Sequence, residues 1–320
     1  MESAPSRLQY FPVSWFSTVM GLSGLSIAWN RAEHFFTSGF CLSSVLLGLT
    51  TLWFLILTAL YALKMVRYPA EVAAEFRHPV KLAFVPTFSI SLILLSIAYL
   101  QSAPNLSFWL WTAGTLLHLG LTLYVLSSWI HHSQYEITHL NPAWFIPVVG
   151  NILIPIAGMH HAPLDISWFF FGLGIFFWPV LTAIIFYRLI FHPALPERLL
   201  PTLFIFIAPP AVGFVSWFNL AGSVDAFGHI LYSVAMVFTL LLFSQFNHFR
   251  RIPFFLSWWA YSFPIAALTI ATFLMARQTG AASYLWIGYG FLGLLSLLVT
   301  LLLGLTVRAV MRREICVPGH

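Results

Sequence analysis

Long apolar runs recur ten times along the chain, and charged residues are confined to their edges and to the short stretches between them. Each run has about the 20 residues that an α-helix needs to cross a bilayer. A helix also satisfies its own backbone hydrogen bonds, as hydrocarbon requires. The pattern predicts an all-α integral membrane protein with ten transmembrane helices. The predicted spans are 12–30, 40–63, 80–102, 106–130, 144–159, 166–190, 200–220, 226–246, 254–276 and 283–307.

Composition agrees with a chain that lies almost entirely in the membrane. Hydrophobic residues make up 60% of it and charged residues 7%, with a mean hydropathy of +0.90. The loops are short, so residues 1–320 are expected to form a single transmembrane domain. The net charge of +5 does not indicate nucleic-acid binding, because the basic residues flank the spans and form no continuous patch.

The basic residues also predict the orientation. If the N-terminus is inside, 12 of the 14 Lys and Arg residues fall in cytoplasmic segments, and only Arg31 and Arg277 fall outside. Cytoplasmic loops of membrane proteins carry this excess of basic residues. Both termini are therefore expected in the cytoplasm.

Prolines divide the spans by parity. Of the prolines that fall inside predicted spans, all but Pro179 lie in odd spans. A proline inside a helix removes a backbone hydrogen bond and bends the helix. The alternation predicts five helical hairpins in a quasi-fivefold ring, with bent odd helices inside lining a central pore and straight even helices outside. The alternative is that prolines are simply common in membrane helices. The predicted kinks at the pore are Pro86, Pro147, Pro209 and Pro264.

The sequence contains little that indicates a catalytic site. Acidic residues map to loops or span ends, and His118 is the one titratable side chain near a span centre. We interpret His118 as a hydrogen-bonded packing residue, with a functional role as the alternative. Phosphate-binding loops, metalloprotease motifs and nucleophile elbows are absent from the sequence. No enzyme activity, cofactor or metal site is predicted.

Span nine contains the one aromatic residue that we single out. Phe263 precedes Pro264 near the middle of the membrane, where the chain is expected to bend. An aromatic ring at such a bend can close a narrow pore, because hydrophobic constrictions exclude water. The chain has 32 phenylalanines, so ordinary packing is the alternative for this residue alone.

Four short motifs, in the same order, resemble those of one known family. They lie in spans three, five, seven and nine: His78-Pro79-Val80, Asn141-Pro142 with Val148-Val149-Gly150-Asn151, Ala208-Pro209-Pro210-Ala211-Val212, and Tyr261-Ser262-Phe263-Pro264. The family comprises the plant guard-cell slow anion channels and the bacterial tellurite-resistance protein A group. The resemblance extends over about residues 12–307.

The resemblance implies ten helices in five hairpins, a pore through the inner odd helices and a homotrimer with one pore per protomer. It also implies that the phenylalanine matching Phe263 occludes the pore and that the protein lies in the bacterial inner membrane. One departure is Ser17, which stands where the family commonly has glycine.

The sequence therefore predicts an anion channel that passively conducts small monovalent inorganic anions through a pore gated by Phe263. The expected partners are such anions, membrane lipid and, as the resemblance implies, further copies of the chain in a homotrimer. The residues expected on the pore wall are Ser17, Thr18, Thr87, Gly150 and Asn151. The main alternative is a secondary transporter or exporter of tellurite or four-carbon dicarboxylates. A membrane scaffold without flux is a third, which leaves the bent odd helices unexplained.

Overall fold

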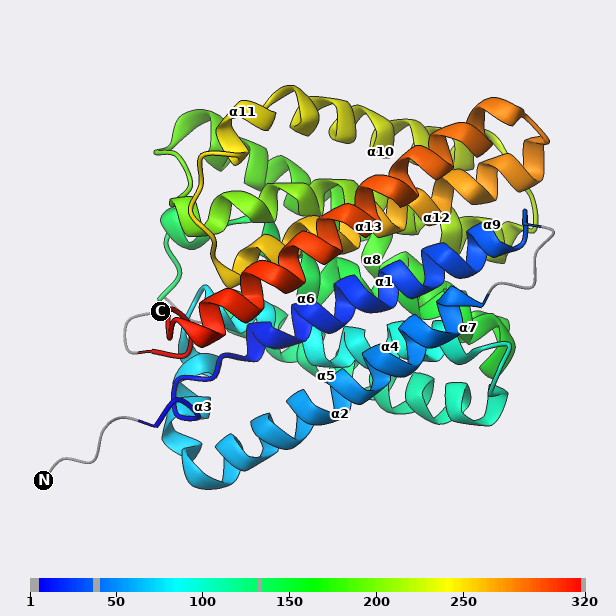
Figure 1. The fold of residues 1–320 in the computed structure, drawn as a ribbon. Helices are drawn as coiled ribbons and strands as arrows, with labels where there is room; N and C mark the ends of the chain where they lie inside the picture. The colour runs from blue at the N-terminus through cyan, green and yellow to red at the C-terminus, as the bar shows by residue number, and fades with distance from the viewer. Residues whose placement is uncertain (1–5, 37–40, 132–133, 318–320) are drawn as a thin grey trace, which may run out of the picture.

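The computed structural model describes residues 6–36, 41–131 and 134–317, and its regular elements in those ranges are α-helices and 3-10 helices (Figure 1). Residue 40, where the second span was predicted to begin, lies outside the described residues. The ten predicted spans each coincide with a helical segment to within about four residues, as boundary predictions allow.

The five even spans are unbroken α-helices, which we call the outer helices. They comprise α2 (Leu42–Arg67), α5 (Pro104–His131), α8 (Leu164–Phe191), α10 (Ala226–Ser244) and α13 (Ala282–Met311). Pro179 lies inside α8, which continues through it.

The five odd spans are composite, and we call them the inner segments. Each begins with a 3-10 helix and continues as an α-helix. The first three are η1 (Val13–Trp15) with α1 (Phe16–Glu33), η2 (Lys81–Phe84) with α4 (Thr87–Tyr99), and η4 (Pro142–Trp144) with α6 (Phe145–Val149), η5 (Gly150–Leu153) and α7 (Ile154–His161). The last two are η6 (Glu197–Ile207) with α9 (Ala208–Ala221) and η7 (Leu256–Tyr261) with α12 (Ser262–Thr279).

The prolines lie where the inner segments change from 3-10 helix to α-helix. Their positions correct the prediction that they bend continuous helices. Pro86 is the N-cap of α4, Pro209 is the second residue of α9, and Pro264 is the third residue of α12. Pro147 is likewise the third residue of the short α6. The first turn of a helix has no partner for its backbone N–H groups, so a proline costs little there. The prolines therefore start α-helices after 3-10 segments rather than bending continuous α-helices.

Burial separates the two sets of helices. In the most apolar 18-residue stretches, 72–89% of residues are buried in the inner segments that contain α4, α7, α9 and α12, against 22–33% in the outer helices. In α1, 12 of the 18 residues are buried. Among the described residues, nine segments have the length and hydropathy of a membrane span. The tenth, α1, ends in the polar Asn30, Arg31 and Glu33.

The inner segments pack against one another in chain order. α1 contacts α4, α4 contacts α7, α7 contacts α9, and α9 contacts α12, which returns to α1. Outer helices pack on the inner segments next to them in sequence, as α2 does on α1 and α13 on α12 (Figure 1). Large apolar side chains of the outer helices, such as Leu49, Val66 and Leu297, are exposed on the outside of the bundle.

Three shorter elements complete the fold: α3 (Pro69–Arg77), η3 (Ile137–His139) and α11 (Phe246–Phe249). The described chain ends meet at one end of the bundle, because the Arg7 guanidinium donates to the carbonyl oxygen of Val310 at 3.1 Å. Helix α3 lies at this same end (Figure 1).

Candidate functional site

A cavity of about 650 Å³ lies inside the circle of inner segments. All five inner segments contribute to its wall, together with α3 and the chain before η1. Its mouth is the end of the bundle that carries the exposed Arg198 and the half-buried Lys81, and we call this end the basic face. The cavity extends from there into the membrane-spanning part of the bundle.

Some wall residues of the second inner segment recur at intervals of three. The series is Lys81 and Phe84 of η2, followed by Thr87 and Ile90 of α4. A 3-10 helix has three residues per turn and places every third side chain in line. In η2, this geometry directs Lys81 and Phe84 to the same side, and the first turns of α4 continue the row into the cavity.

The inner end of the cavity is apolar, and we call it the floor. The lining residue that lies furthest along each inner segment from the basic face, leaving out the wall prolines, is hydrophobic. The floor consists of Met20, Ile90, Leu153, Val212 and Phe263. Each inner segment contributes one of these side chains, so apolar groups from all five segments surround the inner end of the cavity.

Phe263 is positioned by a close contact between α1 and α12. A Cβ atom added at Gly24 would lie 3.5 Å from Cδ2 of Phe263 and 2.6 Å from the Cβ of Ala266. One added at Gly21 would meet Ser262 and Trp259 at 3.0 Å or less. These two glycines let α1 approach α12, and the Phe263 ring lies against Gly24 while it lines the cavity.

Several predicted site residues do lie on the cavity wall: Ser17, Thr87, Gly150, Pro209, Phe263 and Pro264. The two hydroxyl groups are engaged by the backbone, however. Ser17 donates to the carbonyl oxygen of Ser14 at 2.6 Å, and Thr87 donates to that of Phe84 at 2.6 Å. Their hydrogens are therefore used within the wall itself.

The other predicted lining residues face outer helices instead. Thr18 donates to the carbonyl oxygen of Trp15 and accepts a hydrogen bond from the Trp53 indole of α2 at 2.8 Å. The Asn151 amide donates to Thr122 of α5 at 3.0 Å. Their hydroxyl and amide groups thus join inner segments to outer helices. Of the kink prolines, Pro86 and Pro147 accept hydrogen bonds from Ser89 and Thr122 through their carbonyl oxygens.

His118 lies on the outer helix α5 and is fully buried. Its Nδ1 atom is 2.9 Å from the Ser89 hydroxyl, which itself donates to the carbonyl oxygen of Pro86. A Cβ atom added at Gly150 would come within 3.0 Å of His118 Nε2. The imidazole therefore packs directly behind the cavity wall, as a buried and hydrogen-bonded residue.

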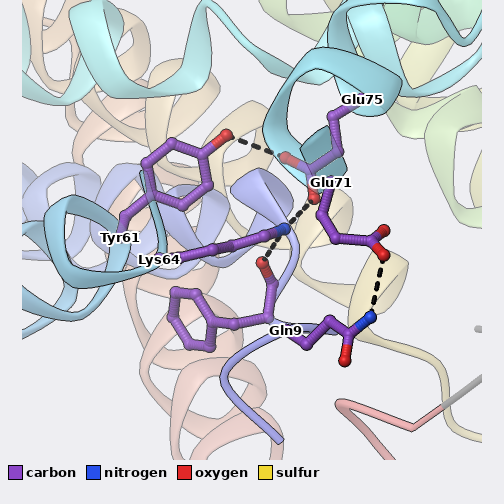
Figure 2. A network of polar contacts seen from close by, with 6 residues as sticks. Gln9, Tyr61, Lys64, Glu71 and Glu75 are labelled. Atoms are coloured by element: carbon purple, nitrogen blue, oxygen red, sulfur yellow. Dashed lines mark hydrogen bonds and ion pairs between the residues drawn. The ribbon is translucent and has the colours of Figure 1, made fainter. Parts of the chain in front are cut away.

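One side of the mouth carries an ion pair that is part of a wider network (Figure 2). Lys64 of α2 donates to Glu75 of α3 at 2.7 Å and to the carbonyl oxygen of Phe11 at 2.8 Å, and both charged side chains are buried. Tyr61 donates to the other oxygen of Glu75 at 2.8 Å, and Gln9 donates to Glu71 at 2.9 Å. The network fixes α3 and the chain before η1 to the end of α2.

The mouth also carries two basic side chains. Lys81 and Arg198 line it, and within the described chain neither side chain makes an ion pair or a side-chain hydrogen bond. His78 lines the same cavity and accepts hydrogen bonds at Nδ1 from the backbone N–H groups of Val80 and Lys81. Burial and the neighbouring charges of Lys81, Arg198 and His139 lower the pKa of His78.

Sequence reasoning missed the charged wall of the cavity. It placed Glu71 and Glu75 in a loop, whereas both lie on α3 and line the cavity. The apolar and acidic spacing of α3 was the available signal, because it predicts a short amphipathic helix. Ser257 was also missed. It lines the cavity, and its buried Oγ has no hydrogen-bond partner in the described part of the chain.

Comparison with known proteins agrees with this architecture. The chain is 28% identical to an uncharacterized transporter of Methanocaldococcus jannaschii over 91% of this chain and 92% of that protein. It is 29% identical to the S-type anion channel SLAH2 of Arabidopsis thaliana, over 93% of this chain and 59% of the plant protein. It is 25% identical to a tellurite resistance protein TehA homolog of Haemophilus influenzae, over 80% of this chain and 79% of that protein.

A family profile matches nearly the whole chain. The SLAC1 profile, described as voltage-dependent anion channel, matches residues 10–307 and so includes all ten spans and every residue of the floor. The family consists of membrane transport proteins and not of enzymes. The chain is therefore a multi-pass membrane protein of the SLAC1 family of voltage-dependent anion channels.

Proposed function

We propose that the chain is an anion channel that passively conducts small monovalent inorganic anions along the axis of the five inner segments. The path enters the cavity at the basic face, crosses the floor and continues between the inner segments to the other side. The five hairpins then form a quasi-fivefold ring within one transmembrane domain. The observation that carries the proposal is the cavity itself, which all five inner segments line and which ends at a floor containing Phe263.

Phe263 is proposed as the gate. It is the bulkiest floor residue, its ring lies against Gly24, and an apolar constriction of this kind excludes water and hence ions. The structure then corresponds to a closed pore. Opening requires the ring to leave the axis, for which the adjacent cavity of about 650 Å³ offers space.

The charges at the mouth suit anions in transit. Glu75 is neutralised by Lys64, so Lys81 and Arg198 provide two positive charges against the one negative charge of Glu71. Such a mouth raises the local concentration of anions. Deeper in the wall, the free hydroxyl of Ser257 is a weak ligand, and weak sites favour conduction over tight binding.

The orientation and assembly belong to the same proposal. By the positive-inside rule, we propose that the basic face and both termini lie on the cytoplasmic side of a bacterial inner membrane. The exposed apolar side chains of the outer helices are compatible with lipid and with a homotrimer that has one pore per protomer. Crosslinking in membranes would establish the number of protomers.

A secondary transporter or exporter of dicarboxylates or tellurite is the second candidate, and two observations bear on it. The basic pair at the mouth fits a dianion, and one relative is named as a tellurite resistance protein homolog. Against it, the floor provides neither a cation nor a protonatable group that could couple the movement of a dianion to protons.

The decisive experiment is a planar-bilayer recording of the wild type and the Phe263→Ala variant. We expect the variant to pass at least about tenfold more current than the wild type, because water can fill the floor once the ring is removed. The reversal potential should follow the anion gradient. Phe176→Ala, which removes a ring exposed to lipid on α8, is the matched control and should leave the current unchanged. A well-folded Phe263→Ala protein without step-like anion currents would rule out the channel.

A further inference from the structure

The basic side of the mouth has the features of a binding site rather than of a merely solvated surface. Lys81 is half-buried and lines the cavity, yet its ammonium group has no partner in the described residues. Arg198 lines the same cavity from η6 and is also without an ion pair there. The acidic wall residues already have hydrogen-bond partners. Glu75 accepts from Lys64 and Tyr61, and Glu71 accepts from Gln9.

The position of His78 adds a third polar group. The hydrogen bonds from Val80 and Lys81 occupy its Nδ1 lone pair. The neutral ring must then carry its proton on Nε2, because each nitrogen of a neutral imidazole is either donor or acceptor. The Nε2–H group is thus left to donate elsewhere. Two cations and one neutral donor share one wall of the cavity.

We propose that Lys81, Arg198 and His78 form a binding site for a small doubly charged oxyanion at the mouth of the cavity, and that the bound dianion blocks the path. Sulfate and hydrogen phosphate have the required chemistry. Their tetrahedral oxygens accept several charge-assisted hydrogen bonds at once, which a monovalent halide cannot match.

The floor explains why a dianion stops at this site. Its five side chains are apolar and provide no charge to replace the water around an ion. The electrostatic cost of removing an ion from water grows with the square of its charge. For a dianion it is therefore about four times that of a monovalent ion of equal size. Monovalent anions pass while the dianion remains at the mouth. The blocking part of this inference rests on the proposed channel function, but the binding part does not.

Binding can be measured without any current. The purified full-length protein is heated in detergent with sodium sulfate or with sodium chloride at equal ionic strength. Sulfate should raise the unfolding temperature of the wild type, because a ligand that binds the folded state stabilises it. Lys81→Gln and Arg198→Gln should each weaken sulfate binding about tenfold, the weight of one charge-assisted hydrogen bond. Arg251→Gln, which removes an exposed charge that does not line the cavity, is the matched control.

Block is measured in the Phe263→Ala background with nitrate as the current carrier. Sulfate added at the basic face should reduce the current, and sulfate at the opposite face should not. The Lys81→Gln/Arg198→Gln double variant should relieve the block, whereas Arg251→Gln should keep it. An absence of sulfate-specific stabilisation in the wild type, or its persistence in the double variant, would overturn the site.

The two measurements separate this inference from the channel proposal. Stabilisation by sulfate without block would refute the blocking role, and a current carried by sulfate would refute it in favour of dianion transport. If Phe263→Ala conducts nothing, the channel proposal and the block fail together, while the thermal measurement still decides whether the dianion site exists.

Discussion

Gly24 of α1 and Phe263 of α12 are in direct apposition, because the glycine leaves only enough room for the phenyl ring and the neighbouring Ala266. A methyl group at position 24 would lie 2.6 Å from the Cβ of Ala266, closer than real Cβ contacts permit. The position of the proposed gate therefore depends on how closely α1 and α12 approach.

Gly24→Ala should weaken the packing that holds the Phe263 ring in place. The added methyl group must push α1 away from α12, at a cost of about 1–3 kcal/mol, as is usual for overpacked cores. We expect a lower unfolding temperature and an anion current between those of the wild type and Phe263→Ala. Gly48→Ala on α2 is the control, because nothing lies within 4 Å of the added methyl group there. Wild-type current and stability in Gly24→Ala would show that this contact does not hold the gate.

Cysteine labelling should map the path along the inner segments. In the Phe263→Ala background, Ser14→Cys, Ala260→Cys and Val212→Cys are expected to react with small water-soluble thiol reagents, because all three positions line the cavity. Thr18→Cys and Asn151→Cys should stay protected, since these side chains bond to Trp53 and Thr122 of the outer helices. Equal labelling of both groups would contradict the assignment of the wall.

The ten spans and the division into inner and outer helices were accessible from the sequence, because hydropathy and proline parity are local signals. The start of α12 at Ser262 was not predictable, because this span begins as the 3-10 helix η7 and the transition from 3-10 to α-helix leaves no hydropathy signal. The direction in which a single polar side chain points also could not be predicted from the sequence. Thr18 and Ser17 are adjacent in sequence, yet one bonds to α2 and the other lines the cavity.

The role of Lys64 illustrates the same limit. In the sequence it is one of several basic residues next to the end of a predicted span, and its pairing with Glu75 depends on where α3 folds back. Phe263, in contrast, was singled out by the motif Tyr261-Ser262-Phe263-Pro264 and the family resemblance that it carries, and the structure places it on the cavity wall. The structure adds to this the floor, which unites side chains from five segments that are far apart along the chain.

Lys64→Met should destabilise the basic face. It removes the partner of a buried carboxylate, and breaking a buried ion pair costs about 3–5 kcal/mol. The double variant Lys64→Met/Glu75→Gln should lose less stability than Lys64→Met alone, because no unpaired charge remains. Arg67→Met, which changes an exposed residue on the same helix, should have little effect. Thermal unfolding in detergent provides the comparison, and additive losses in the double variant would mean that the pair is not coupled.

Sulfate binding should become tighter in mild acid. Burial, followed by the charges of Lys81, Arg198 and His139, lowers the pKa of His78, so the free site holds a neutral imidazole at neutral pH. A bound dianion attracts the proton and raises that pKa, and by linkage protonation must strengthen dianion binding in return. The gain should be absent at alkaline pH and should grow as the pH falls below the ordinary histidine value of about 6.5.

His78→Gln provides the corresponding control, because glutamine retains hydrogen-bonding groups but does not titrate. The sulfate-induced rise in unfolding temperature should then lose its dependence on pH between neutral and mildly acidic conditions. Sulfate keeps both of its charges over this range, so the ligand itself contributes no titration. Glu71 is the cavity-lining carboxylate that makes no ion pair within the described residues, and Glu71→Gln should leave the pH dependence in place. A pH dependence that survives in His78→Gln would assign it to another group.

Selectivity among monovalent anions should follow the ease with which each ion loses its water. The floor is apolar, and the wall hydroxyls of Ser17 and Thr87 already donate to backbone carbonyl oxygens. The pore therefore cannot compensate the dehydration of a strongly hydrated ion. We expect nitrate, iodide and thiocyanate to permeate better than chloride, with fluoride lowest, and cations to be largely excluded by Lys81 and Arg198 at the mouth. Bi-ionic reversal potentials in the Phe263→Ala background measure this order. A preference for chloride over nitrate would require a strong anion ligand in the path, and the free hydroxyl of Ser257 would be the first residue to replace, as Ser257→Ala.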